Sequence, residues 1–200
     1  MGKKLIIKGA DFSAVAVDSL LTLDSIAWDN KTYREIFETN NFLGISPGFE
    51  NGSYSPLVVN SGEPTITNEV ADSGQYSLKA FGNTSQQIKK SVGAAANTYY
   101  IAYRISCTRY VSGIAGVIYG TGASSPKVES ITQGFISMSG IVNYTGTTNY
   151  LFFVGSASSA DLDCYIDTPV VVLGSYFSTL PTEEQFAQLY EQYVAIKKGA

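Results

Sequence analysis

The feature that most constrains the fold is a series of seven or eight apolar runs, separated by turn-forming residues, between about residues 41 and 176. Runs such as "TYYIAYRISCTRY" and "LDCYIDTPVVVLGS" are rich in β-branched and aromatic residues. The stretches between them, such as "FGNTS" and "GSASSAD", carry the Gly, Asn and Ser that favour tight turns. Because no helical pattern intervenes to connect parallel strands, the sequence predicts an all-β sandwich or jelly roll over residues 41–176.

The two ends of the chain have different patterns. Residues 1–40 mix apolar and polar positions without a clear period and include the single tryptophan, Trp28, so we expect an N-terminal arm that packs on the sandwich or on another subunit. Residues 177–200 predict a C-terminal amphipathic helix with a capping box at Thr182 and Gln185. The apolar stripe expected to cover a sheet face or an interface consists of Phe186, Leu189, Tyr190, Tyr193 and Ile196.

The composition excludes several classes of function. The chain has 13 Lys and Arg against 17 Asp and Glu, so it lacks the basic field that nucleic acids require. It has no histidine, which removes the commonest general base and zinc ligand. The apolar run near the N-terminus ends at Lys8, too short for a signal peptide or a membrane span. Cys107 and Cys164 are interpreted as buried thiols, with a disulfide between two strands as the alternative.

Three segments resemble carbohydrate-binding modules of the galactose-binding-like jelly-roll type. They are "PGFENG" at 47–52, "ADSGQYSLKAFG" at 71–82 and "LDCYIDTPVVV" at 162–172, and they stand in the order of that family. The resemblance implies that "GFENG" is the opening strand, with Phe49 buried. The family strand usually continues to a tryptophan, but this chain has Tyr54 instead. The resemblance also implies a structural Ca²⁺ held by Glu50, Asp72 and Asp167, with backbone carbonyls completing its coordination.

Both ends are also similar to parts of bacteriophage and prophage tail or fibre proteins. The segment "PVVVLGSYFSTLPTEEQFAQLYEQY" resembles the close of such proteins, and "KKLIIKGADFS" resembles the opening of phage-derived proteins carried by gut bacteria. This resemblance implies a virion protein that leaves the cell by lysis, contacts other virion subunits and forms a homo-oligomer, often a trimer.

Strand alternation suggests a sugar platform on the predicted strand at 99–108. Tyr99, Ile101 and the following odd-numbered residues would face the core, which leaves Tyr100 and Arg104 on the opposite, solvated face. Tyrosine stacks on sugar rings and arginine reaches hydroxyl or carboxylate groups. The alternative is that both side chains only pack over an exposed face. Further candidates for the platform are Tyr110, Tyr119 and Trp28.

The leading hypothesis is a non-catalytic module of a phage or prophage virion that recognises a cell-surface glycan or polysaccharide. The alternatives are a structural virion protein without a sugar site and the accessory domain of a polysaccharide-degrading enzyme. Paired carboxylates can hydrolyse glycosides without histidine, and Asp161, Asp163 and Asp167 cluster in the sequence, but nothing in the sequence marks Asp163 or Asp167 for a raised pKa. The chain is therefore not expected to be an enzyme.

Overall fold

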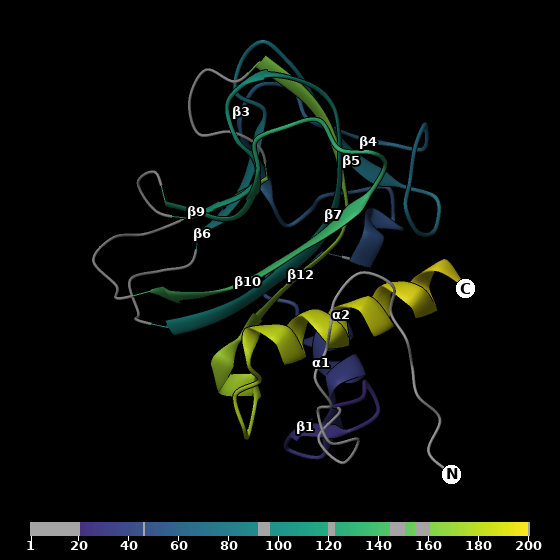
Figure 1. Cartoon of the computed structure of the whole chain (residues 1–200), viewed down its shortest axis with the longest axis vertical. Coiled ribbons are helices and arrows are strands. Elements are labelled where there is room, and N and C mark those ends of the chain that lie inside the picture. The colour runs from purple at the N-terminus through teal and green to yellow at the C-terminus, as the bar shows by residue number, and fades with distance from the viewer. Residues whose placement is uncertain are drawn as a thin grey trace, which may run out of the picture.

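The computed structural model describes residues 21–45, 47–91, 97–119, 123–144, 151–154 and 161–199. The described chain forms two antiparallel five-stranded sheets that pack face to face, with helices outside one of them (Figure 1). The expected jelly-roll sandwich with a C-terminal helix is therefore confirmed. The segment "KKLIIKGADF" at residues 3–12, whose sequence predicts a short strand, lies outside the described residues.

The first sheet has the strand order β10-β7-β12-β5-β4 and the second has the order β3-β6-β11-β8-β9. The strands of the first sheet are β4 (Thr65–Thr67), β5 (Ser77–Gly82), β7 (Asn97–Ser112), β10 (Ile136–Tyr144) and β12 (Asp161–Leu173). Those of the second are β3 (Val58–Ser61), β6 (Gln87–Ser91), β8 (Ala115–Tyr119), β9 (Ala123–Val128) and β11 (Leu151–Val154). The remaining elements are β1 (Ile26–Trp28), β2 (Lys31–Thr32), α1 (Tyr33–Thr39), η2 (Pro47–Phe49), η3 (Gly174–Tyr176) and α2 (Glu183–Lys198).

The inner core lies between the two sheets. The odd-numbered residues of β7 point into it, from Tyr99 to Cys107, as the alternation predicts. Cys107 and Cys164 are direct partners across β7 and β12, and both are fully buried free thiols. The interpretation of these residues as buried thiols therefore fits the structure.

A second core lies on the outer face of the first sheet. The even-numbered β7 residues Tyr100 and Ala102 pack there against α2, while Phe37 of α1 contacts the rings of Phe186 and Tyr193 edge-on. Figure 1 shows α2 running beneath β7, β10 and β12, with α1 and β1 farther out. Capping boxes begin both helices, at Thr32 with Glu35 and at the predicted Thr182 with Gln185.

Two local expectations are wrong. The "GFENG" segment is a tight turn and not a strand, because Gly48 and Phe49 adopt φ values of 74° and 59°, outside the β region. The turn nevertheless buries Phe49 completely in the inner core. In α2, Ile196 of the last turn is 39% exposed, and Val194 is buried instead.

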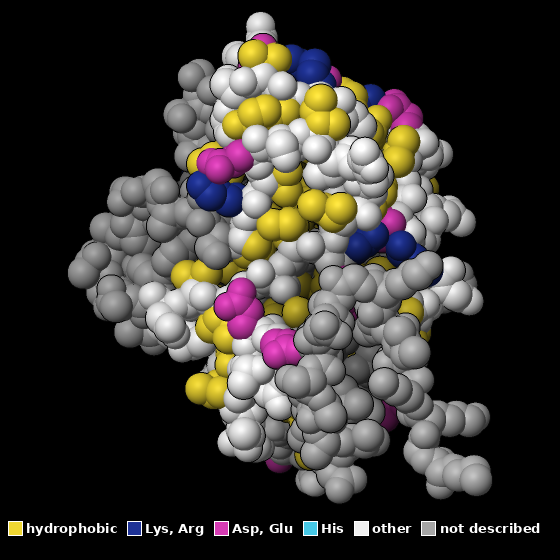
Figure 2. Space-filling model, in the orientation of Figure 1, with side chains coloured by type: hydrophobic (Ala, Val, Ile, Leu, Met, Phe, Trp, Pro, Cys, Tyr) yellow, Lys and Arg dark blue, Asp and Glu magenta, His cyan; other side chains and the backbone are white. Residues whose placement is uncertain are grey.

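The described surface carries few charges, in agreement with a composition of 15% charged residues. Figure 2 shows one face of the molecule, on which acidic and basic side chains occur only in small groups. Among the described residues, no helix has the length and apolar character that a membrane crossing requires. Recognition on such a surface has to depend on local shape and hydrogen bonding more than on a strong electrostatic field.

Candidate functional site

The platform predicted at Tyr100 and Arg104 is not exposed. Tyr100 is 2% exposed, and its hydroxyl donates to the carbonyl oxygen of Pro181 at 2.9 Å. The Arg104 side chain is 11% exposed and donates to Asp72 at 2.6 Å and to Ser137 at 2.8 Å. The prediction that this face is solvated was wrong because α2 and the N-terminal segment cover it.

The two further platform candidates whose side chains the structure describes, Trp28 and Tyr110, pack in different parts of the fold. Trp28 lies in β1, half-buried, with its ring 5.3 Å from that of Tyr176 in an edge contact. Tyr110 packs partly against the inner core and donates its hydroxyl to the carbonyl oxygen of Gly113. Tyr119 ends β8, and its side chain lies outside the described part of the structure.

The three predicted calcium ligands have different partners. Glu50 accepts backbone hydrogen bonds from Gln75 at 3.0 Å and Tyr76 at 3.4 Å. Asp167 is fully buried and accepts backbone hydrogen bonds from Asp72 at 2.7 Å and Ser73 at 2.9 Å. The Asp72 carboxylate itself pairs with Arg104 and, at 2.9 Å, with Lys198.

This arrangement reduces the expected ligand set to two carboxylates. No group of three or more potential ligands that could hold a metal occurs among the described residues. A Cβ atom placed on Gly48 would lie 3.1 Å from Glu50 Oε1 and 3.3 Å from Asp167 Oδ1. The carboxylates of Glu50 and Asp167 therefore border the same small space next to Gly48, which we call the Gly48 corner. Asp72 instead forms an ion pair with Arg104.

The pKa values in this region follow from burial and pairing. Burial raises the pKa of Asp167 to about 6, against the opposing effect of its backbone hydrogen bonds. Burial would also raise the pKa of Asp72, but its hydrogen bonds and charge interactions with Arg104 and Lys198 outweigh that effect and hold the pKa below its ordinary value. The oxygen of Asp167 that faces Gly48, Oδ1, also accepts hydrogen bonds from the Thr168 N–H at 2.6 Å and from the Thr168 hydroxyl at 3.0 Å.

Two of the three carboxylates considered for glycoside hydrolysis are held by one arginine, and the third is the fully buried Asp167. Arg109 forms ion pairs with Asp161 and with Asp163, the latter at 2.8 Å. Hydrogen bonding from Arg109 holds the pKa of Asp163 below its ordinary value, although partial burial opposes this. A general acid needs a raised pKa, so Asp163 is unsuited to that role.

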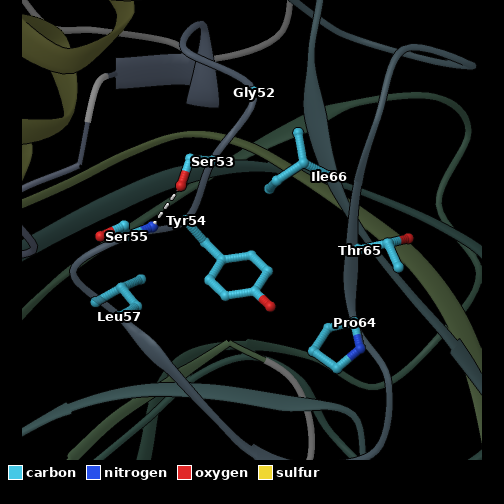
Figure 3. A pocket seen from close by; sticks show the side chains of 8 residues that line it. All are labelled: Gly52, Ser53, Tyr54, Ser55, Leu57, Pro64, Thr65 and Ile66. Atoms are coloured by element: carbon cyan, nitrogen blue, oxygen red, sulfur yellow. Dashed lines mark hydrogen bonds between the residues drawn. The ribbon is translucent and has the colours of Figure 1, made fainter.

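A groove lies between the loop that follows η2 and the edge strand β4. Residues 52–55 and 57 form one wall and residues 64–66 the other, and the volume between them is about 420 Å³. We call this site the Tyr54 groove. Figure 3 shows the Tyr54 ring extending from the loop toward β4, with Ser53 and Ser55 beside it. The volume falls within the range of about 300–1,000 Å³ that is typical of small-molecule sites.

Local hydrogen bonds hold the loop wall of this groove. The backbone N–H of Ser53 donates to Asn51 Oδ1 at 3.1 Å, and that of Ser55 donates to Ser53 Oγ at 3.0 Å. The backbone N–H of Leu57 donates to the Tyr54 carbonyl at 2.8 Å, and the Leu57 side chain is buried in the inner core. Tyr54 is thus held half-exposed on a loop that is anchored at both ends.

The Tyr54 groove combines an aromatic ring with hydroxyl groups. Ser53, Ser55 and Thr65 each offer a hydroxyl that can donate and accept, as the hydroxyls of a sugar do. Tyr54 was not among the predicted platform residues, because the sequence shows it only as a departure from the tryptophan of the resembling family. The opposite wall could not be found from the sequence, since only folding brings residues 64–66 to this loop.

Comparison with solved structures finds proteins of the same fold. A structure described as "Family 16 Carbohydrate Binding Module-2" matches with a TM-score of 0.51 at 15% identity, over 65% of this chain and 99% of that one. A CBM22-1–CBM22-2 tandem domain from Paenibacillus barcinonensis Xyn10C matches with a TM-score of 0.50 at 17% identity, over 63% of this chain and 44% of that one. The chain thus has the jelly-roll fold of carbohydrate-binding modules.

Comparison with protein-family models finds no matching family, and comparison with curated proteins finds no matching relative. At such low identities the structural similarity establishes the fold alone.

Proposed function

We propose that this chain is a non-catalytic carbohydrate-binding module that recognises a cell-surface glycan or polysaccharide through the Tyr54 groove. The observation that carries the proposal is the half-exposed Tyr54 ring in an open groove edged by hydroxyl side chains. Sugars bind proteins by stacking their C–H faces on aromatic rings while their hydroxyls form hydrogen bonds. The fold shared with carbohydrate-binding modules supports the same conclusion.

A glycan array followed by titration with the best ligand tests this function. Tyr54→Ala is expected to weaken binding at least tenfold, because the stacking surface is lost. Tyr54→Phe keeps the ring and is expected to stay within about threefold of the unmodified protein. Tyr100→Phe removes only a hydroxyl buried under α2 and serves as the control. Absence of binding to any glycan, with or without calcium, would refute the proposal and favour a purely structural protein.

We further propose that the module belongs to a phage or prophage virion protein, as the resemblance of its two ends suggests. A virion component is expected to be present in purified particles and to assemble as a homo-oligomer, often a trimer, whereas an accessory domain of a polysaccharide-degrading enzyme is expected to be a monomer. Mass spectrometry of particles and light scattering of the purified chain distinguish the two. A monomer absent from particles would support the accessory-domain alternative.

We propose, finally, that the Gly48 corner holds a structural Ca²⁺. Glu50 and Asp167 would supply carboxylate oxygens, the donor type that calcium prefers. When bound, the ion would supply positive charge to a fully buried carboxylate whose pKa burial raises to about 6. Glu50 precedes the loop that carries Tyr54 and holds the turn at Gln75, so its fixed position also helps to place one wall of the groove.

A further inference from the structure

We infer that the Tyr54 groove selects neutral glycans and discriminates against those that carry carboxylate or sulfate groups. The inference rests on the proposed function and adds the class of sugar. It is based on three features of the described residues: the chemistry of the lining, the charges in the flanking segments, and the position of the nearest lysines.

The lining of the groove is entirely uncharged. Its polar side chains are the hydroxyls of Ser53, Tyr54, Ser55 and Thr65, and the remaining residues are apolar or glycine. A carboxylate or sulfate is strongly hydrated, and it must be paired with a cation or several strong donors when it leaves water. Hydroxyl side chains can replace the water around a neutral sugar, but they provide no compensating charge.

The chain segments that build both walls are free of cations. Residues 35–78 contain no lysine or arginine, and they contain six acidic residues. Glu50 precedes the loop wall, Glu63 directly precedes the β4 wall, and both are exposed. An acidic sugar in the groove would therefore find no cation in these segments, and the exposed Glu63 at the start of the β4 wall adds a like charge.

The strands next to the groove walls carry three lysines, Lys79, Lys89 and Lys90, but none of them lines the groove. Lys79 pairs with Thr65 across β5 and β4, and its Nζ lies 2.6 Å from a carboxylate oxygen of Glu69. Lys90 Nζ lies over the ring of Phe42, 5.0 Å from its centre, and burial lowers the pKa of this lysine. Lys79 is neutralised by Glu69, Lys89 of β6 lies opposite Val58, and Lys90 lies over the Phe42 ring, so we assign none of them to an anionic ligand.

The test compares neutral and acidic glycans on one array, then measures affinity for the best ligand of each kind at 50 and 500 mM NaCl. We expect the strongest ligands to be neutral, with affinities that change less than about twofold over this range of salt. A best ligand that carries uronate, sialate or sulfate and loses tenfold or more in affinity at high salt would overturn the inference. If Tyr54→Ala still abolished that binding, the proposed function would stand; if nothing bound, both would fall.

Two variants sharpen the result. Thr65→Lys places a cation on the exposed rim of β4 and is expected to raise affinity for a sulfated or carboxylated glycan at least fivefold at 50 mM NaCl. Lys90→Gln is the matched control and is expected to leave the ranking of the glycans unchanged. Loss of an acidic ligand in Lys90→Gln would mean that this lysine does bind anions, and would contradict the inference.

Discussion

Gly74 allows the Glu50 carboxylate to lie directly against the backbone of the turn at residues 72–76. Its φ is 61°, in the left-handed region that favours glycine, and a Cβ atom at this position would lie 2.3 Å from the carboxylate. Such a contact cannot be accommodated unless Glu50 moves. Gly74 is thus needed for two reasons: the turn requires a positive φ at this position, and the Glu50 carboxylate occupies the space of a Cβ atom.

Gly74→Ala is therefore expected to destabilise the protein more than a glycine substitution that changes φ alone. The control is Gly134→Ala, where φ is 77° and no atom lies within 4 Å of the added Cβ. We expect the control to cost about 1 kcal/mol from backbone strain and Gly74→Ala to cost about 2 kcal/mol or more. Urea unfolding measures both. Equal losses would mean that Glu50 moves away freely and that its hydrogen bonds to the turn contribute little.

Tyr100 and Tyr54 show how much of a single residue's environment can be predicted from the sequence. Alternation correctly placed Tyr99 and Tyr100 on opposite faces of β7, but it carries no information on what covers each face. The covering residues come from α2 and from the N-terminal segment, about 80 residues away in each direction. Tyr54 was noted only as a departure from the family tryptophan, because a groove is a property of two segments and not of one.

At the scale of elements, Asp72 links three parts of the fold. It lies in the loop before β5, pairs with Arg104 of β7 and also contacts Lys198 in the last turn of α2. The resemblance to carbohydrate-binding modules implied a calcium ligand here, yet the nearby cations are placed only by the tertiary structure. The role of Asp72 as an ion-pair partner depends on Arg104 and Lys198, which lie 32 and 126 positions farther along the chain.

Asp72→Asn is expected to lower the free energy of unfolding by about 3 kcal/mol at pH 7, because it leaves Arg104 buried without its carboxylate. The pairing lowers the pKa of Asp72 in the folded state, so its contribution is present above the unfolded pKa of about 4 and is lost as pH falls through the folded value. The variant should therefore lose less stability than the unmodified protein between pH 5 and pH 3. Chemical denaturation across this pH range measures the difference.

The control for this pair is Asp24→Asn, which breaks the exposed ion pair of Asp24 with Arg34. Surface pairs contribute little, so we expect a loss below about 1 kcal/mol. If the two substitutions had equal effects, the Asp72 pair would behave as a surface pair in solution.

The start of α2 offers a second test at this scale. Thr182 Oγ1 accepts from the backbone N–H of Gln185 at 3.2 Å, and the Gln185 side chain accepts from the backbone N–H of Thr182 at 2.9 Å. Thr182→Ala removes one half of this capping box and is expected to cost about 1 kcal/mol, whereas Thr182→Ser keeps the hydroxyl and should cost less than half of that. Equal losses in a thermal unfolding experiment would show that the cap does not stabilise the helix.

At the scale of the whole molecule, the terminal segments turn one outer sheet face into a second core. The solved module with the TM-score of 0.51 matches 65% of this chain, which leaves about a third outside the shared fold.

The sandwich could be predicted from the sequence because runs of strand-forming residues and the turns between them are local signals. The sequence predicted the helix equally well from its period and cap, but not which face the helix covers. Sugar recognition on this molecule is therefore proposed away from that covered face, at the loop and the edge strand of the Tyr54 groove.

Calcium, if held at the Gly48 corner as proposed, should stabilise the whole domain, because binding to the folded state alone shifts the unfolding equilibrium. At a concentration about 100 times the dissociation constant, the gain is about 2.7 kcal/mol, which corresponds to a rise in Tm of roughly 5 to 10 °C for a chain of this size. Chelation of calcium should reverse this rise in Tm.

Three variants test the ligands. Glu50→Gln and Asp167→Asn each remove a proposed ligand and should abolish the rise in Tm that calcium causes, whatever their effect on Tm without calcium. Asp72→Asn should lower Tm but keep the increment, because its carboxylate is engaged by Arg104 and Lys198. A Tm that calcium and chelator leave unchanged would exclude the ion, and an increment lost in Asp72→Asn alone would restore that residue as a ligand.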